Sequence, residues 1–182
     1  MAYIGFRKLM AATLNNDGTY GTPAAIGKAI SMTVTPNFAE ASLYGDDLMV
    51  EHDEAFTDAD LTLGSTYMPV AMYNTLFGHT VTTTDVTFDV DDSTPYVGIA
   101  AYAPKKVDGT TYYEAIFLVK CKMTEPEMSF ETKGDSITYN TPEISGKAMT
   151  DSNGVWKYTS LCATEAAAVT WINSKFGYTP GT

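Results

Sequence analysis

The chain has 182 residues, of which 22 are acidic and 11 basic, and its formal net charge at pH 7 is −11. This length suffices for one domain with a sizeable core, and the negative charge argues against tight nucleic-acid binding, which needs positive groups against the phosphates. No apolar run has the length of a membrane span, and Arg7 and Lys8 interrupt the stretch that a signal peptide would need. We therefore expect no membrane partner and a protein made and kept in a cytoplasm.

Strands are predicted through most of the chain. Residues 29–35 alternate Ile30, Met32 and Val34 with serine and threonine, which is typical of a half-buried strand. Residues 1–25 precede this pattern as a candidate N-terminal arm, and residues 177–182 follow the last predicted element as a short tail. Further predicted strands are DLMVEHDEAF (47–56), DADLTLG (58–64), DVTFDV (85–90), EMSFETK (127–133), SITYNTPEIS (136–145) and GVWKYTSL (154–161).

Two short amphipathic helices are predicted, at residues 69–77 and 164–176. Pro69 suits the first turn of the first helix, and Gly78 ends it. Thr164 is the expected N-cap of the second helix, and Gly177 follows its last turn. Two such helices beside many strands indicate a mainly β (α+β) protein in which the helices cover a sheet.

Residues 96–123 indicate a long hairpin whose strands meet at the Asp108-Gly109 turn. A two-residue turn of this kind fixes the register and places Val107 opposite Thr110. One face then pairs Tyr102 with Ala115, Ala100 with Phe117, Gly98 with Val119 and Tyr96 with Cys121. The other face pairs Ala101 with Ile116 and Ile99 with Leu118, with Lys120 and Lys122 at its far end. A bulge at Pro104 is the alternative, and it would shift these pairs by one residue.

Both faces of this hairpin are apolar, whereas a strand pair wet on one side alternates more cleanly. Something must therefore cover the second face, which carries Ile99, Ile116 and Leu118. One interpretation is that the predicted helices of the same chain cover it. The other is that part of the cover is a second copy of the protein, so that these three residues belong to a subunit interface.

Residues that carry chemistry are sparse. Cys121 and Cys162 lie in apolar strand-like segments and are predicted to be buried free thiols. The Gly-Lys pair at 146–147 lacks the first glycine and the hydroxyl of a phosphate-binding loop. The acidic run at 89–93 lacks the glycine and distant glutamate of a calcium-binding hand, so at most a loose calcium site is indicated. We expect neither an enzyme nor a cofactor.

A series of short blocks follows one order along the chain. LYGDD, DADLTLG and LFGH precede YVGIAAYAPKKVDGTTYYEAIFLVKCKMTEP, which is followed by TKGDSITYNTPEISGKAM, NGVW and AAAVTWINSKFG. In this order the blocks resemble the major tail protein of long-tailed bacteriophages. The similarity covers nearly the whole chain beyond about residue 25, and it rests on the order of the blocks rather than on a single motif. The stretch VEHDEAFTDAD departs from the family by being more acidic.

The resemblance implies a single tail tube domain spanning residues 1–182, with a β-sandwich or barrel-like fold and two short flanking helices. It further implies a structural role in the virion, with hexameric rings that stack into a tube. DNA would pass through the bore during ejection, and other tail proteins would meet the ends of the tube. None of the matching blocks is catalytic.

The acids Asp46, Asp47, Glu51 and Asp53 are candidates to line or approach the bore of such a tube. A negative wall repels DNA phosphates and lets the DNA slide. The simpler interpretation is an exposed outer or inter-ring loop, since charged runs are usually just solvated. An alternative function is a β-sandwich binding or adhesion module of a phage or bacterial surface, for which the twelve tyrosines of the chain would be suitable.

Overall fold

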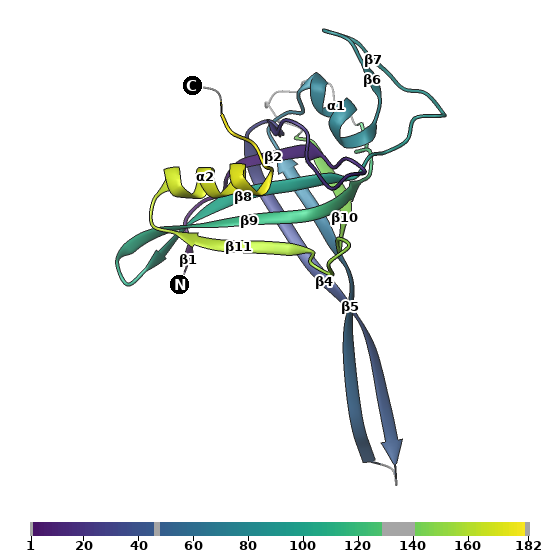
Figure 1. Ribbon diagram of the computed structural model, residues 1–182, viewed down its shortest axis with the longest axis vertical. Coiled ribbons are helices and arrows are strands. Elements are labelled where there is room, and N and C mark those ends of the chain that lie inside the picture. Colours follow the sequence, from purple (N-terminus) through teal and green to yellow (C-terminus); the bar gives the residue numbers. More distant parts are fainter. Residues whose placement is uncertain (1, 46–47, 129–140, 181–182) are drawn as a thin grey trace, which may run out of the picture.

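The computed structural model describes residues 2–45, 48–128 and 141–180, and it is mainly β with two helices, which confirms the predicted α+β class (Figure 1). The helices are α1 (Val70–Phe77) and α2 (Glu165–Lys175). The strands are β1 (Ala2–Tyr3), β2 (Arg7–Thr13), β3 (Ala24–Ala25), β4 (Ala29–Gly45), β5 (Leu48–Ser65), β6 (Thr80–Val81), β7 (Val86–Thr87), β8 (Val97–Val107), β9 (Thr110–Met123), β10 (Glu143–Met149) and β11 (Lys157–Cys162).

Most of the strands form one antiparallel sheet in the order β3-β2-β8-β9-β10-β5-β4. The sheet divides at β9, because β11 pairs with its residues 113–118 and β10 with its last four residues. The short strand β1 pairs with the turn end of β8. The pair β6 and β7 forms a separate small sheet at the end of the molecule opposite the tip of β4 and β5 (Figure 1).

The larger hydrophobic core lies between the β2-β8-β9 part of the sheet and the β5-β10 part, which faces it. In the view of Figure 1, β4 and β5 run steeply across β8 and β9. Helix α1 closes this core with Met72, Leu76 and Phe77, and it ends at Gly78, whose left-handed backbone lets its N–H bond to the Asn74 carbonyl. The strands contribute Leu9, Ala11, Ala59, Leu61, Leu63, Val97, Ile99, Ala101, Leu118, Cys121, Met123, Ile144 and Ala148.

A second core lies on the opposite face of β8 and β9, beneath α2. The Thr164 side chain caps this helix by accepting the Ala167 N–H at 3.2 Å, as predicted. In the first turn, Glu165 accepts the Tyr102 hydroxyl and lies 3.4 Å from Arg7, which joins the start of α2 to β8 and β2. Burial and the hydrogen bond to Glu165 raise the pKa of Tyr102 to about 12. The helix buries Ala168, Ile172 and Phe176 against Ala100, Ala115 and Phe117.

The β8-β9 hairpin is thus the middle layer of the molecule and is covered on both faces by its own chain. Ile99 and Leu118 have no exposed surface and pack into the larger core. Ile116 lies on the same face and is half-buried. For Ile99 and Leu118 the cover is therefore α1 together with the facing strands, so neither side chain is available to a second copy in this conformation.

The register of the hairpin agrees with the prediction from Val107–Thr110 to Ile99–Leu118. Beyond that point the predicted pairs Gly98–Val119 and Tyr96–Cys121 are wrong, because β9 contains an extra residue and Val97 pairs with Cys121. The bulge lies at Gly98 rather than at Pro104. It moves Lys120 and Lys122 to the α2 face, since a shift of one residue exchanges the two faces of a strand.

The contacts of Tyr20 and Val119 account for the bulge. A Cβ added at Gly98 would lie 2.5 Å from a ring carbon of Tyr20, so only glycine leaves room for that ring. The Tyr20 hydroxyl donates to the Val119 carbonyl at 2.7 Å, and the Val119 N–H donates to the Trp156 carbonyl at 3.1 Å. Val119 is therefore bonded outside the β8-β9 ladder.

Several predicted strands have different bounds in the structure. The segments 47–56 and 58–64 are one continuous strand, β5, because Thr57 and its neighbours stay extended through a bulge. The segment 85–90 is reduced to β7, and residues 129–140 lie outside the described residues. The segment 1–25, predicted as an N-terminal arm, instead supplies a strand of the body. β2 pairs with β8 and buries Leu9 and Ala11.

The two cysteines are free and buried, as predicted. Cys121 belongs to the larger core, whereas Cys162 belongs to the core beneath α2, so the sheet separates them. Burial raises the pKa of the Cys121 thiol far above its ordinary value. Both residues therefore act as small apolar side chains.

Leu118 and Ile116 provide a matched test of this packing. Leu118→Ala should lower the free energy of unfolding by about 2 to 5 kcal/mol, because it leaves a cavity in a filled core. Ile116→Ala should lower the free energy of unfolding clearly less, since this side chain is already partly exposed. Urea denaturation of both variants measures the difference. Equal losses would contradict the described cover of this face.

Candidate functional site

The most unusual feature of the molecule is a two-stranded ribbon, formed by residues 37–45 and 48–56, that projects from the body (Figure 1). We refer to it as the arm. Within the described residues, β4 pairs only with β5, and β10 pairs with β5 only along Ala59–Gly64. Both strand edges of the described arm are therefore unpaired, and the side chains at 39–42 and 52–55 are exposed on both of its faces. An isolated two-stranded hairpin is at best marginally stable in water, so such a ribbon calls for a partner.

A polar clamp holds the base of the arm. The Asn37 amide donates to Asp58 at 2.7 Å and to Asp60 at 2.9 Å, and Lys147 Nζ lies 3.0 and 3.2 Å from the same two carboxylates. These hydrogen bonds, first from Asn37 and then from Lys147, lower the pKa of both aspartates. Thr57 is the extra residue of a bulge here and donates to the Asn37 carbonyl. The clamp fixes the direction in which the arm leaves the body.

Aromatic rings form a second anchor at the base. Phe56 stacks on Trp156 with ring centroids 4.8 Å apart and an interplanar angle of 14°. Phe38 meets the edge of Phe56 at 6.0 Å, yet half of its surface remains exposed. These three rings thus extend from Trp156 in the body to the half-exposed Phe38 on one face of the arm.

The same face of the arm carries two glutamates directly opposite each other. Glu40 pairs with Glu54 across the ribbon, and both are exposed. Like charges in this position destabilise a strand pair. His52, the next residue on that face, lies 3.3 Å from Glu54 and offsets part of the repulsion only when it is protonated. The other face carries Ala39, Ala41, Ala55 and Asp53.

The arm is strongly acidic as a whole. Residues 37–56 contain six acids and no lysine or arginine. The four acids predicted to approach a bore all belong to this segment. Of these, Asp53 is exposed on the alanine-rich face, whereas Asp46, Asp47 and the side chain of Glu51 lie outside the described part of the structure.

Lysines gather at a different place, on the α2 face of the sheet. The Nζ atoms of Lys120 and Lys122 lie 4.3 and 5.6 Å from the ring centroid of Tyr96. Lys175, in the last turn of α2, lies 3.9 Å from that of Tyr158. Together, Tyr96, Lys120, Tyr158 and Lys175 line a hollow of about 540 Å³, which we call the lysine hollow.

The charge of the lysine hollow is not neutralised by any residue in the described part of the chain. Lys120, Lys122 and Lys175 form no ion pair among the described residues. Asp151 also lines the hollow, but one of its oxygens accepts the N–H groups of Asn153 and Val155 at 2.8 Å each. The sequence did not predict this cluster, because the bulge at Gly98 decides on which face Lys120 and Lys122 lie.

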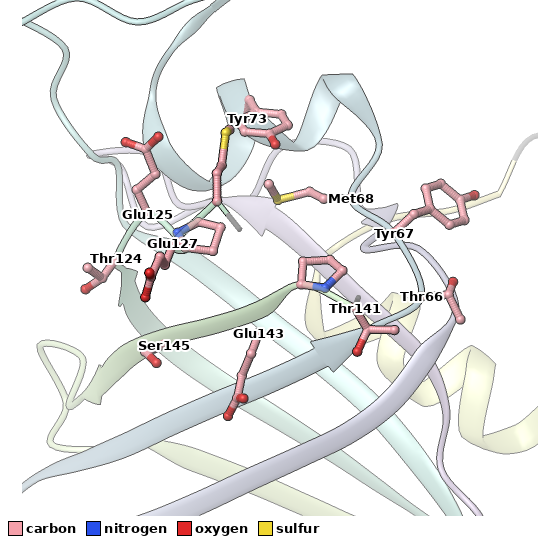
Figure 2. Close-up of a pocket in the computed structure, with 13 residues that line it drawn as sticks. Thr66, Tyr67, Met68, Tyr73, Thr124, Glu125, Glu127, Thr141, Glu143 and Ser145 are labelled. Atoms are coloured by element: carbon pink, nitrogen blue, oxygen red, sulfur yellow. The ribbon is translucent and has the colours of Figure 1, made fainter. Parts of the chain in front are cut away.

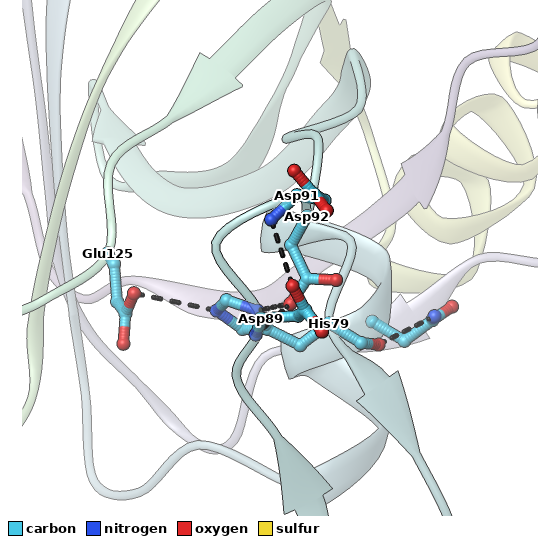
Figure 3. A network of polar contacts seen from close by, with 6 residues as sticks. His79, Asp89, Asp91, Asp92 and Glu125 are labelled. Carbon is cyan, nitrogen blue, oxygen red and sulfur yellow. Dashed lines mark hydrogen bonds and ion pairs between the residues drawn. The ribbon is translucent and has the colours of Figure 1, made fainter.

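His79 forms a buried polar network that sequence reasoning also missed (Figure 3). Asp92 accepts hydrogen bonds from His79 Nδ1 at 2.6 Å and from the Asp89 N–H at 2.9 Å, and these bonds lower the pKa of Asp92. On the other side, His79 Nε2 lies 3.5 Å from Glu125 but makes no hydrogen bond among the described residues. The network therefore joins the acidic run 89–93 and Glu125 to the end of α1.

An open groove of about 900 Å³ lies between the start of α1, the segment after β9 and the start of β10 (Figure 2). Its described lining includes Glu125 and Glu127 from the segment after β9 and Glu143 from the start of β10, together with Tyr67 and Met68. Among the described residues of that lining there is no cysteine, histidine or lysine, whereas Thr66, Thr124, Thr141 and Ser145 contribute hydroxyl groups.

No group of three or more side chains suited to a metal ion occurs among the described residues. None of the described helices combines the length and the apolar composition that crossing a membrane requires. No protein-family model matches the chain, and no curated protein is significantly similar to it.

The clamp at the base of the arm can be tested with Asn37→Ala. This change leaves Asp58 and Asp60 with Lys147 alone, so the arm should open more often and its amide hydrogens at 39–55 should exchange on the order of tenfold faster. Hydrogen exchange read by mass spectrometry gives the measurement, with β8 and β9 remaining protected. Asn16→Ala, in an exposed turn, is the control. Unchanged exchange in the arm would show that the clamp does not hold it.

Proposed function

We propose that this chain is a structural subunit of a bacteriophage tail tube, in which hexameric rings of identical copies stack around a bore that DNA crosses during ejection. The protein would act in the virion after assembly in the bacterial cytoplasm, and other tail proteins would contact the ends of the tube. The proposal assigns no catalysis and no cofactor to the chain.

The observation that carries this proposal is the arm. Residues 39–42 and 52–55 of this ribbon are exposed, and its described strands pair only with each other beyond the base. Such a ribbon costs conformational entropy and gains little apolar burial while it stands alone. It becomes favourable when a second molecule covers a face or pairs with an edge. A subunit of a large assembly has such a neighbour permanently.

The exposed strand edges support the same conclusion. β4 forms one edge of the main sheet over its whole length, and Pro36 is the only residue within it that lacks an N–H. In a monomer a long open edge is a risk, whereas edges that pair around a ring are closed. A head-to-tail contact that closes gives a ring, and a second contact that repeats gives a stack.

The resemblance of the sequence blocks adds the identity of the assembly, since tail tubes consist of such rings. The body agrees with this interpretation in its class, because it is a mainly β domain with two helices. The acidic arm fits a bore in which DNA phosphates must slide without binding.

An arm deletion tests the proposed function. Replacing residues 39–55 by an Asn-Gly turn keeps Phe38 and Phe56 at the base and should leave a folded body, since both cores lie outside the arm. We expect the wild-type protein to form rings and tubes on concentration, and the deletion variant to remain monomeric. Sedimentation and negative-stain electron microscopy measure both. A wild-type protein that is monomeric at every concentration would contradict the tube.

The bore-facing acids require a separate experiment. Changing Asp46, Asp47, Glu51 and Asp53 to lysine should slow DNA ejection from assembled particles, because positive side chains in the bore attract phosphates. The delay should be largest at low ionic strength, where screening is weak. A control variant reverses the same number of charges at the exposed residues Asp17, Asp85, Asp91 and Asp108. Normal ejection at every ionic strength would remove these acids from the bore and leave the tube unaffected.

The alternative function is a binding or adhesion module of a phage or bacterial surface. The lysine hollow supports it, because exposed Tyr96 and Tyr158 beside polar residues resemble a site for a sugar or a protein segment. Self-association separates the two functions. A binding module stays monomeric on concentration, whereas a tube subunit forms rings.

A further inference from the structure

The acidic arm and the lysine hollow are complementary in charge, and within the described residues Glu40, Lys120, Lys122 and Lys175 form no ion pair. We propose that the arm of one copy docks with Glu40 and Glu54 in the lysine hollow of a second copy. This proposal rests on the proposed function and names the contact that joins neighbouring subunits. It assigns a role to three lysines that are unusual in a chain of net charge −11.

On the arm, the opposed pair Glu40–Glu54 is the element that requires a cation. The two carboxylates occupy directly paired positions and share one face with the half-exposed Phe38. Of these two glutamates, His52 contacts only Glu54 among the interactions of the described residues. A partner that offers ammonium groups to both glutamates and an apolar surface to Phe38 would remove the repulsion and cover the ring.

In the hollow, the lysines are already positioned to meet such a face. Lys120 lies over Tyr96 and Lys175 over Tyr158, so the tyrosine rings hold the ammonium groups at the surface of one depression. Lys122 adds a third charge beside Tyr96. Holding these groups in place before contact lowers the entropic cost of forming the ion pairs.

The contact must join two molecules. From residue 37 to residue 45 an extended strand covers about 30 Å, and the clamp together with Trp156 directs the arm away from the body. Helix α2, which carries Lys175, lies on the body beside β8 and β9, far from the outer ends of β4 and β5 (Figure 1). Each copy thus offers one arm and one hollow, and this head-to-tail arrangement extends into a ring or a filament.

Charge reversal provides the test. The arm variant carries Glu40→Lys and Glu54→Lys, and the hollow variant carries Lys120→Glu and Lys175→Glu. Each variant alone should need a protein concentration at least about tenfold higher for assembly, because every contact then joins like charges. Mixed in equal amounts, the two variants should assemble again, since each arm then meets a hollow of opposite charge. The control variant Lys28→Glu with Lys106→Glu changes the net charge equally at other exposed positions and should assemble like the wild type.

Recovery in the mixture would itself show that both variants are folded, because an unfolded variant could not assemble. The mixture thereby separates a loss of assembly caused by unfolding from one caused by charge repulsion. Sedimentation and electron microscopy of each variant, the mixture and the control give the result. Assembly of either variant at the wild-type concentration, or a mixture no better than its parts, would overturn the contact and leave the tube standing. Recovery in the mixture without any rings or tubes would support the contact and contradict the proposed function.

Discussion

The structure depends on one constraint, which is that the β8-β9 hairpin is apolar on both faces and must be covered on both. The chain meets this requirement with α2 on one face and with α1 and the β5-β10 strands on the other. This places the hairpin in the middle layer and forces the sheet to bend over it. β5 is thereby drawn across the hairpin, and its continuation beyond the body becomes the arm.

The body and the arm differ in the burial of their side chains. Leu61 and Leu63 of β5 are buried in the larger core, whereas residues 39–42 and 52–55, beyond Phe38 and Phe56, are exposed. The body therefore satisfies its own packing, and the arm does not. In a tube, the second partner of the arm would be supplied by assembly, so the stability of the ring and of the arm would be gained together.

Charged side chains are also distributed unequally between the arm and the body. Most surface acids are solvated, but Glu40 and Glu54 face each other on the arm while Lys120 and Lys175 converge on the α2 face. Two sets of opposite charge, one on the arm and one on the α2 face of the body, permit a head-to-tail contact between copies. The repulsion expected between copies of net charge −11 is then overcome locally rather than over the whole surface.

The sequence by itself determined the mainly β class, both helices with Thr164 and Gly78 at their ends, the free thiols and most of the hairpin register. These features depend on local patterns, namely periodicity, capping residues and a two-residue turn. The sequence also showed that Ile99 and Leu118 needed a cover, without deciding which one.

Only the tertiary structure decided which segments supply that cover, because the answer depends on contacts between residues distant in the chain. It also decided the bulge at Gly98, which arises from the Tyr20 ring and moves Lys120 and Lys122 to the other face. The arm was missed because alternation along residues 47–64 indicates strands but not whether a third strand lies beside them. His79 was missed for the same reason, since Asp92 and Glu125 reach it only through the fold.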